Sequence, residues 1–361
     1  MTARLLVVGT GLIGTSIGLA LGAPQDVVLV DADEEHLAAA VARGAGRRWD
    51  GAPVHHAVLA VPPGRIAGEL AVLQRCDVAL TYSHVSSTQA LLQAEIQTSG
   101  SQTSSLCGSH PMAGRERSGP TAAGADLFVG RPWALCPSDQ TSPAALAATR
   151  ALAVDCGSDP VVLTAQEHDA AVALVSHLPQ VAASAVAAVL LGAPRGPDGD
   201  GLLRLSGPGL QDTTRIAASD PALWTDVLRQ NAAAVAPLVR ALSAELDRAA
   251  DALARLADGD GTGSREVEAL LARGRAGRER VPVKHGEQDS AFARVAIGVP
   301  DQPGQLAGVL VSAAEAGINV EDVRVEHLAG RPRGVIELLV HAAARPHAQQ
   351  ELAAAGWEVL V

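Results

Sequence analysis

The sequence predicts an α/β protein in three parts: a doubly wound, mostly parallel sheet, an all-helical domain and a small α+β unit. Short apolar runs alternate with helical segments in the first part of the chain, which is typical of repeated βαβ units. Long alanine-rich segments with helical periodicity follow, and after a polar, glycine-rich stretch a strand, helix, strand and strand pattern begins. The expected parts are a sheet domain at 1–141, a helical domain at 142–275, a linker at 276–290 and an α+β domain at 291–361.

The composition limits the classes of protein to consider. The 361 residues are too many for one ordinary core, and 48% hydrophobic with 19% charged residues is typical of a globular chain. The net charge of −11 argues against a nucleic-acid partner, whose phosphates require a basic surface. No stretch after the N-terminal region looks long and apolar enough to span a bilayer, so we expect no membrane partner. The four cysteines have no C-x-x-C spacing, which indicates free thiols in the cytoplasm and no metal site.

The segment 4–21, RLLVVGTGLIGTSIGLAL, predicts a dinucleotide site. An apolar strand leads into G-x-G-x-x-G, a helix follows, and the next apolar run ends in Asp31. The glycines permit the tight turn, the approach of a pyrophosphate and close packing of helix on strand, while Asp31 would accept hydrogen bonds from a ribose and repel a 2′-phosphate. NAD is therefore expected rather than NADP; the alternatives are a glycine-rich turn of another α/β domain or a signal-peptide core. The expected cofactor contacts are Gly9, Gly11, Leu12, Ile13, Gly14 and Asp31.

Further strands and helices continue this sheet. The segment 87–97 reads as a helix opened by Ser87 or Thr88. The segment 103–114, TSSLCGSHPMAG, is expected to run from a strand into a loop. The overlapping segment 107–120, CGSHPMAGRERSGP, is too rich in turn formers for a regular strand or helix, and it is charged, which marks a candidate functional loop. Beyond it, strand 131–137 closes the first part. The other expected strands are 27–31, 56–62 and 77–83, and the other expected helices are 33–44, 63–74, 142–157, 165–192 and 220–259.

Four stretches in this order resemble the prephenate/arogenate dehydrogenase family of tyrosine biosynthesis with a C-terminal ACT domain. They are the glycine turn, HPMAGRERSG at 110–119, EHDAAVALVSHLP at 167–179 and DTTRIAASDPALWTDVLRQN at 212–231. The resemblance implies a Rossmann-type sheet, a helical dimerisation domain and a small ferredoxin-like ACT module. It also implies an NAD-dependent oxidative decarboxylation of prephenate: hydride passes to NAD, the ring carboxylate departs as CO₂, and the ring becomes aromatic.

The same resemblance implies roles for individual residues. His110 would accept the proton of the 4-hydroxyl, a task for which a near-neutral pKa is suited, with Ser87 beside it. Arg215 would anchor a substrate carboxylate. His168 and Asp169 match family positions, and a supporting structural role is favoured for both. The remaining substrate contacts implied are Ser176, Gln180, Glu116, Asp212 and Trp224.

Two departures from the family pattern leave alternatives open. Gln180 stands where many members have a histidine, so arogenate remains an alternative substrate. His84 and Gln89 replace the aspartate and lysine of the usual D-V-x-S-x-K pattern, while Ser87 is retained. Two other classes remain: a different NAD enzyme, such as a hydroxyacid dehydrogenase or imine reductase, and a non-catalytic NAD-binding amino-acid sensor.

The C-terminal unit and the helical domain imply partners. VPDQPGQLAGVL and AGINVEDVRVEH resemble the ACT signature, which implies tyrosine bound near Asp301, Gly304 and Asn319; a dimerisation module without a ligand is the alternative. The long apolar faces of the helical domain predict a homodimer, with Arg215 close to the interface.

Overall fold

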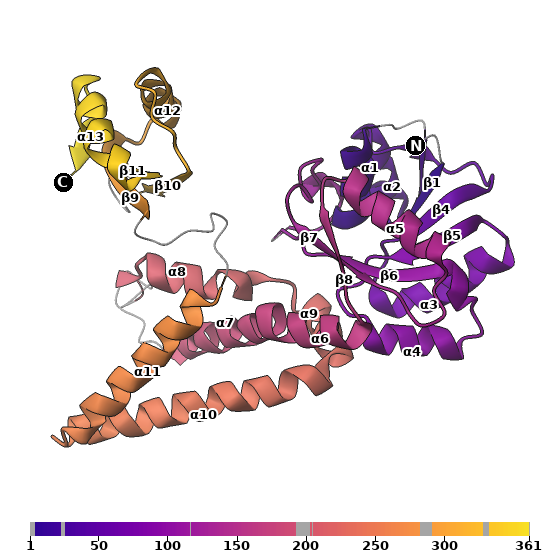
Figure 1. Ribbon diagram of the computed structural model, residues 1–361, viewed down its shortest axis with the longest axis horizontal. Coiled ribbons are helices and arrows are strands. Elements are labelled where there is room, and N and C mark those ends of the chain that lie inside the picture. The colour runs from indigo at the N-terminus through magenta and orange to yellow at the C-terminus, as the bar shows by residue number, and fades with distance from the viewer. Residues whose placement is uncertain are drawn as a thin grey trace. The chain divides into compact units, whose positions relative to one another are not determined.

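A computed structural model describes residues 4–22, 26–115, 117–192, 203, 205–281, 291–327 and 332–360 (Figure 1). The chain divides into two compact units, residues 1–251 and 252–361.

The first unit contains an eight-stranded sheet in the order β3-β2-β1-β4-β5-β6-β7-β8. Neighbouring strands are parallel, except that β7 runs antiparallel to β6. The order reverses between β1 and β4, as in doubly wound nucleotide-binding sheets, so the predicted Rossmann-like sheet is confirmed. The strands are β1 (Leu5–Val8), β2 (Val27–Val30), β3 (Arg47–Arg48), β4 (Val54–Leu59), β5 (Ala79–His84), β6 (Leu106–Pro111), β7 (Pro132–Cys136) and β8 (Asp159–Val162).

Helices cover both faces of this sheet because the strands are apolar on both faces. Along β1, Val7 belongs to the core under the first face and Leu6 to the core under the second. The first face carries α1 (Leu12–Leu21), α2 (Glu34–Ala42) and α5 (Pro143–Asp155), and the second carries α3 (Pro63–Arg75) and α4 (Ala90–Thr98).

Two sequence-based boundaries are wrong. The sheet domain does not end at residue 141, because α5 packs on the first face and β8 pairs with β7, which extends the sheet domain to Val162. The strand expected at the start of 103–114 is present as β6, but it extends to residue 111 between β5 and β7, into the segment 107–120 that was expected to be irregular. Pairing on both sides and burial of Cys107 and Ser109 override the weak strand propensity of Gly108 and Pro111.

The helical part of the first unit begins with α6 (Ala165–Val172), a π-helical turn (Ala173–His177) and α7 (Leu178–Val189), which run on as one helix. It continues with α8 (Pro208–Thr214), a 3-10 turn (Arg215–Ala218), α9 (Pro221–Gln230) and α10 (Ala232–Ala257). The helix expected at 220–259 is therefore broken, because Asn231 leaves helical geometry at φ −116° and ψ 21°. The second unit begins within α10 and continues with α11 (Thr262–Glu279).

One helix contradicts the expectation that no later stretch could span a bilayer. Ala165–Gly192 is long and apolar enough by length and composition, and 17% of its most apolar window is buried. The helix has the bounds expected from the sequence, and the run from residue 170 to 192 contains no Asp, Glu, Lys or Arg, which makes it apolar enough.

The C-terminal part of the second unit is a four-stranded antiparallel sheet in the order β10-β11-β9-β12. The expected strand, helix, strand and strand are present, and a further helix and strand complete a β-α-β-β-α-β order, the order of the ferredoxin-like module that the resemblance implies. Its core joins Ile297 and Leu338 of the sheet to Val309 and Leu352 of the helices. The elements are β9 (Phe292–Pro300), α12 (Gln305–Glu315), β10 (Asp322–His327), β11 (Arg333–His341), α13 (Arg345–Ala354) and β12 (Glu358–Leu360).

Candidate active site

The turn between β1 and α1 has the backbone that a dinucleotide site needs. Gly9 has φ +96°, and a Cβ there would lie 2.6 Å from the carbonyl oxygen of Ala60. A Cβ on Gly14 would lie 1.9 Å from the carbonyl oxygen of Gly9, so only glycine allows this helix to approach the turn. A Cβ on Gly11 would meet nothing within 4 Å, and the start of α1 has no side-chain cap. Open space before free N–H groups fits a pyrophosphate.

Asp31 follows β2 at the same edge of the sheet. Its Oδ2 accepts hydrogen bonds from Thr10 N at 2.5 Å and Thr10 Oγ1 at 2.8 Å, and its Oδ1 accepts one from Asp33 N at 2.9 Å. Burial by itself raises the pKa of Asp31, but these hydrogen bonds outweigh burial and lower the pKa overall. The carboxylate is therefore ionised and oriented beside the glycine turn, as ribose recognition requires.

His110 lies at the carboxyl end of β6, the edge of the sheet where ligands bind in doubly wound folds. Its Nδ1 is 2.9 Å from Nε2 of His168 on α6. The two rings meet edge to face, with centroids 5.2 Å apart. The sheet domain and the helical domain thus each contribute one histidine to a direct contact.

Asp169 connects His168 to the backbone that follows the loop after β5. His168 Nδ1 lies 2.8 Å from Asp169 Oδ1, which also accepts from Gln89 N at 2.9 Å, while Oδ2 accepts from Ala90 N at 2.8 Å. Asp169 therefore caps α4 from a different helix. The expectation that Ser87 or Thr88 opens this helix is wrong, since α4 begins at Ala90.

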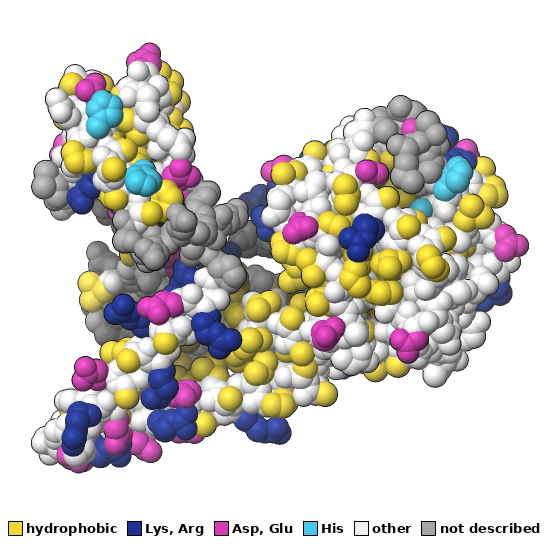
Figure 2. Space-filling model, in the orientation of Figure 1, with side chains coloured by type: hydrophobic (Ala, Val, Ile, Leu, Met, Phe, Trp, Pro, Cys, Tyr) yellow, Lys and Arg dark blue, Asp and Glu magenta, His cyan; other side chains and the backbone are white. Residues whose placement is uncertain are grey.

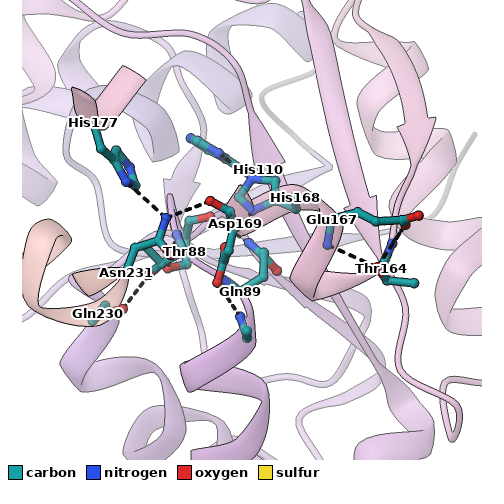
Figure 3. A network of polar contacts seen from close by, with 12 residues as sticks. Thr88, Gln89, His110, Thr164, Glu167, His168, Asp169, His177, Gln230 and Asn231 are labelled. Atoms are coloured by element: carbon teal, nitrogen blue, oxygen red, sulfur yellow. Dashed lines mark hydrogen bonds and ion pairs between the residues drawn. The ribbon is translucent and has the colours of Figure 1, made fainter. Parts of the chain in front are cut away.

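Asn231, between α9 and α10, extends the network further (Figure 3). Its Nδ2 donates to the carbonyl oxygen of Asp169 at 2.8 Å and lies 3.1 Å from Nδ1 of His177. The His177 ring in turn meets Trp224 edge to face at 5.9 Å. Sequence reasoning assigned Asn231 no role; the available signal was its place at the end of the family-like stretch 212–231.

The electrostatics of the network favour the neutral form of His110, His84 and His177. Desolvation and the neighbouring His168, His177 and His84 lower the pKa of His110 to about 3, and desolvation with His168 lowers that of His84 to about 3. Desolvation also lowers the pKa of His177, although Asp169 opposes this. The near-neutral pKa expected for His110 is wrong in this environment. His110 is instead an uncharged imidazole at neutral pH, able to accept a proton but not to hold it strongly.

The substrate residues expected on the helical domain are partly brought together. Gln180 on α7 is buried and donates from Nε2 to the carbonyl oxygen of Ile216 at 3.0 Å. This bond ties α7 to the 3-10 turn that begins with Arg215. Arg215 and Asp212 are exposed in the single chain.

Other expected site residues have simpler surroundings. Ser87, in the loop between β5 and α4, and Ser176, in the π-helical turn, are half-buried. Glu116 lies outside the described residues. Within the described ranges, no three His, Cys, Asp or Glu side chains are placed to hold a metal ion.

The two departures from the family pattern, His84 and Gln89, lie together. A Cβ placed on Gly108 would be 2.5 Å from Gln89 Oε1 and 3.1 Å from His84 Nε2, so the two side chains converge on one point. Gln89 Nε2 donates to the carbonyl oxygens of Ser86 at 2.7 Å and Ser109 at 3.0 Å. Both side chains also line a cavity of about 20 Å³, enough for one water molecule.

Comparison with known proteins gives matches along most of the chain. Residues 19–163 match the family model of the prephenate dehydrogenase nucleotide-binding domain, and residues 164–265 match that of the prephenate dehydrogenase dimerization domain. A probable prephenate dehydrogenase from Streptomyces niveus is 37% identical over 342 residues, which cover 93% of each chain. A cyclohexadienyl dehydrogenase from Zymomonas mobilis is 36% identical over 152 residues, 42% of this chain and 51% of its own.

Solved structures agree on the fold. Arogenate dehydrogenase from Synechocystis is 25% identical with a TM-score of 0.62, over 77% of this chain and 99% of its own. Prephenate dehydrogenase from A. aeolicus, in complex with hydroxyphenyl propionate and NAD⁺, is 24% identical with a TM-score of 0.65, over 77% of this chain and 98% of its own.

Proposed function

Since this chain belongs to the prephenate dehydrogenase family, we propose that it catalyses the NAD-dependent oxidative decarboxylation of prephenate to 4-hydroxyphenylpyruvate. NAD bound at the glycine turn would supply the hydride acceptor for the ring carbon that bears the hydroxyl. The observation that carries the proposal is a neutral histidine, His110, at the carboxyl edge of the sheet whose first turn fits a dinucleotide. The ring carboxylate leaves as CO₂, and the formation of an aromatic ring drives the reaction.

His110 takes the proton of the 4-hydroxyl as the hydride leaves. Loss of CO₂ then leaves an electron pair in the ring, and the resulting phenolate recovers a proton from His110. The dianionic substrate becomes a monoanionic product and neutral CO₂, so the reaction releases no net proton. A base with a lowered pKa is suited to these two steps, because His110 must give back to the phenolate the proton that it accepts from the hydroxyl.

Arg215 anchors a substrate carboxylate in this proposal, and Ser87, Ser176, Asp212 and Trp224 contact the substrate. A guanidinium pairs with a carboxylate through two parallel hydrogen bonds. Gln180 holds the turn that carries Arg215 through its bond to Ile216. Its Oε1 accepts no hydrogen bond from the described residues and could accept from the ammonium of arogenate. We therefore propose arogenate as a second substrate.

The test is NADH formation with prephenate and with arogenate, using His110→Asn as the control. We expect turnover of prephenate and a loss of about 10²- to 10⁴-fold in kcat for His110→Asn. Turnover of simple hydroxyacids alone would favour a different dehydrogenase, and tight NAD binding without any turnover would favour the amino-acid sensor.

We also propose a cytoplasmic homodimer built through the helical domain. Hydrophobic side chains gather over its long helices (Figure 2), and exposed ones on the helix Ala165–Gly192 include Val175, Val189 and Leu191 at 64%, 77% and 89%. A surface of this kind marks an interface. Light scattering should give a dimer, and Val189→Glu should weaken it; a monomer at micromolar concentration would contradict the proposal.

For the C-terminal sheet we propose an ACT-like module that binds tyrosine as a feedback ligand. The β-α-β-β-α-β order supports this, as does Gly304, which starts α12 at φ +90° without a side-chain cap. Asp301 and Asn319 are exposed on the neighbouring loops. Tyrosine should raise the melting temperature and slow the enzyme. If it does neither, the module serves dimerisation alone.

A further inference from the structure

We propose that His168 and Asp169 fix His110 in the tautomer whose Nε2 is bare, and so act as positioning residues for the proton-accepting atom. The proposal rests on the proposed function of His110 as the base. It assigns these two residues, whose family match alone indicates only a supporting role, a specific task in the chemistry. It follows from the direction in which each hydrogen bond of the network must run.

The direction is set at Asp169. Its two carboxylate oxygens accept hydrogen bonds from the backbone N–H groups of Gln89 and Ala90, whose protons cannot be relocated. A carboxylate has no proton to give, so the third contact, with His168 Nδ1 at 2.8 Å, must be donated by the imidazole. The backbone of α4 thus determines which nitrogen of His168 carries the proton.

The donor in the contact between His168 and His110 can be assigned in the same way. We take His168 to carry a single proton, and an imidazole that donates this proton from Nδ1 can only accept at Nε2. The 2.9 Å contact between His168 Nε2 and His110 Nδ1 is therefore donated by His110. His110 then has its proton on Nδ1 and a lone pair on Nε2, which is the atom left to take the proton of the substrate hydroxyl.

The charged and titratable groups around His110 explain why the direction of these hydrogen bonds matters for the reaction. The titratable groups that act on His110 are His168 from α6, His177 from the π-helical turn and His84 from β5. Asp169 supplies the negative charge of the network, and it is connected to His110 through His168. When His110 gains a proton on Nε2, the hydrogen bonds from His110 Nδ1 through His168 to Asp169 stabilise the imidazolium, and each group keeps the same hydrogen-bond partner. If the hydrogen bonds between Asp169, His168 and His110 had the opposite direction, Nε2 of His110 would carry a proton and could not act as a base.

The experiment is histidine tautomer analysis of the full chain by long-range ¹H–¹⁵N spectroscopy with ¹⁵N-labelled histidine, with His110→Asn to assign the His110 signals. We expect neutral His110 with the proton on Nδ1. Asp169→Asn presents an amide that can donate to His168 and reverse the chain, so the His110 proton should move to Nε2. We expect kcat to fall about 10²- to 10⁴-fold with KM nearly unchanged. Glu167→Gln, the same chemical change on the exposed face of α6, should alter neither readout.

A second variant covers the case in which Asp169→Asn fails to fold. His168→Phe keeps a ring of similar shape and leaves Asp169 free to cap α4, but it removes the acceptor for His110 Nδ1. The tautomer of His110 should then become mixed and kcat should fall. Wild-type His110 with its proton on Nε2, or an unchanged tautomer and kcat in the folded variants, would overturn the proposal. The spectra need no substrate, so a wrong reaction would appear separately, as absent turnover with the tautomer as expected.

Discussion

Positions 84 and 89 are buried together, with His84 2% and Gln89 1% exposed, and both side chains converge on Gly108. The family pattern places an aspartate and a lysine there, one negative and one positive charge. This chain has replaced both by neutral groups, because desolvation holds His84 uncharged with a pKa of about 3. We predict that the two replacements are energetically coupled, since either charge alone would be buried without a partner.

The magnitude follows from that burial. An uncompensated buried charge costs about 3–5 kcal/mol, so His84→Asp and Gln89→Lys should each lower the melting temperature by roughly 10 °C. In the double variant the carboxylate and the ammonium can pair across Gly108, and the adjoining cavity of about 20 Å³ gives room for the longer lysine. The coupling free energy should be about 1–3 kcal/mol in favour of the pair.

The assay is urea unfolding of the wild type, both single variants and the double variant, followed by circular dichroism. Gln89→Met is the matched control, because it loses the hydrogen bonds to Ser86 and Ser109 without adding charge. If the two single losses simply add in the double variant, the side chains are not partners and the reasoning is refuted.

Four further predictions follow from single contacts. Gly14→Ala places a methyl 1.9 Å from the carbonyl oxygen of Gly9, so the affinity for NAD by calorimetry should fall by about tenfold or more. Asp31→Asn removes the charge that repels a 2′-phosphate, so the ratio of kcat/KM for NAD to that for NADP should fall; an unchanged ratio would place Asp31 away from the ribose. Asn231→Ala leaves the carbonyl oxygen of Asp169 and Nδ1 of His177 without their donor, and should cost about 1–3 kcal/mol in urea unfolding. Burial lowers the pKa of His56 from 6.5 to about 4, so the unfolded chain binds the extra proton, and His56 should contribute a loss of stability of about 3 kcal/mol as pH drops from 6.5 to 4. Because the pKa values of His84 and His110 are also lowered, His56→Gln should reduce the slope of this limb of the stability curve without removing it.

The N-terminal turn was predictable because all of its requirements are local. Gly9, Gly11 and Gly14 lie within six residues of one another, and each answers a backbone need that arises inside one strand–turn–helix unit. The two faces of the sheet were predictable for a similar reason, since alternate residues of β1 enter opposite cores. Motifs alone identified His110, Gln180 and Arg215 as candidate site residues. They did not identify the residues that contact these side chains in the fold.

The sequence by itself determined the local patterns: the doubly wound sheet, the helical segments, the dinucleotide turn and the motifs that carry the family resemblance. Only the tertiary structure brought His110 of β6, Asp169 of α6 and Asn231 between α9 and α10 into one network. It also decided that Asp169 caps α4, that β8 completes the first sheet and that the pKa of His110 is low. The physical reason is range, because hydrogen bonds between distant segments and desolvation depend on which groups the fold buries together, and neither has a signature within a short stretch of sequence.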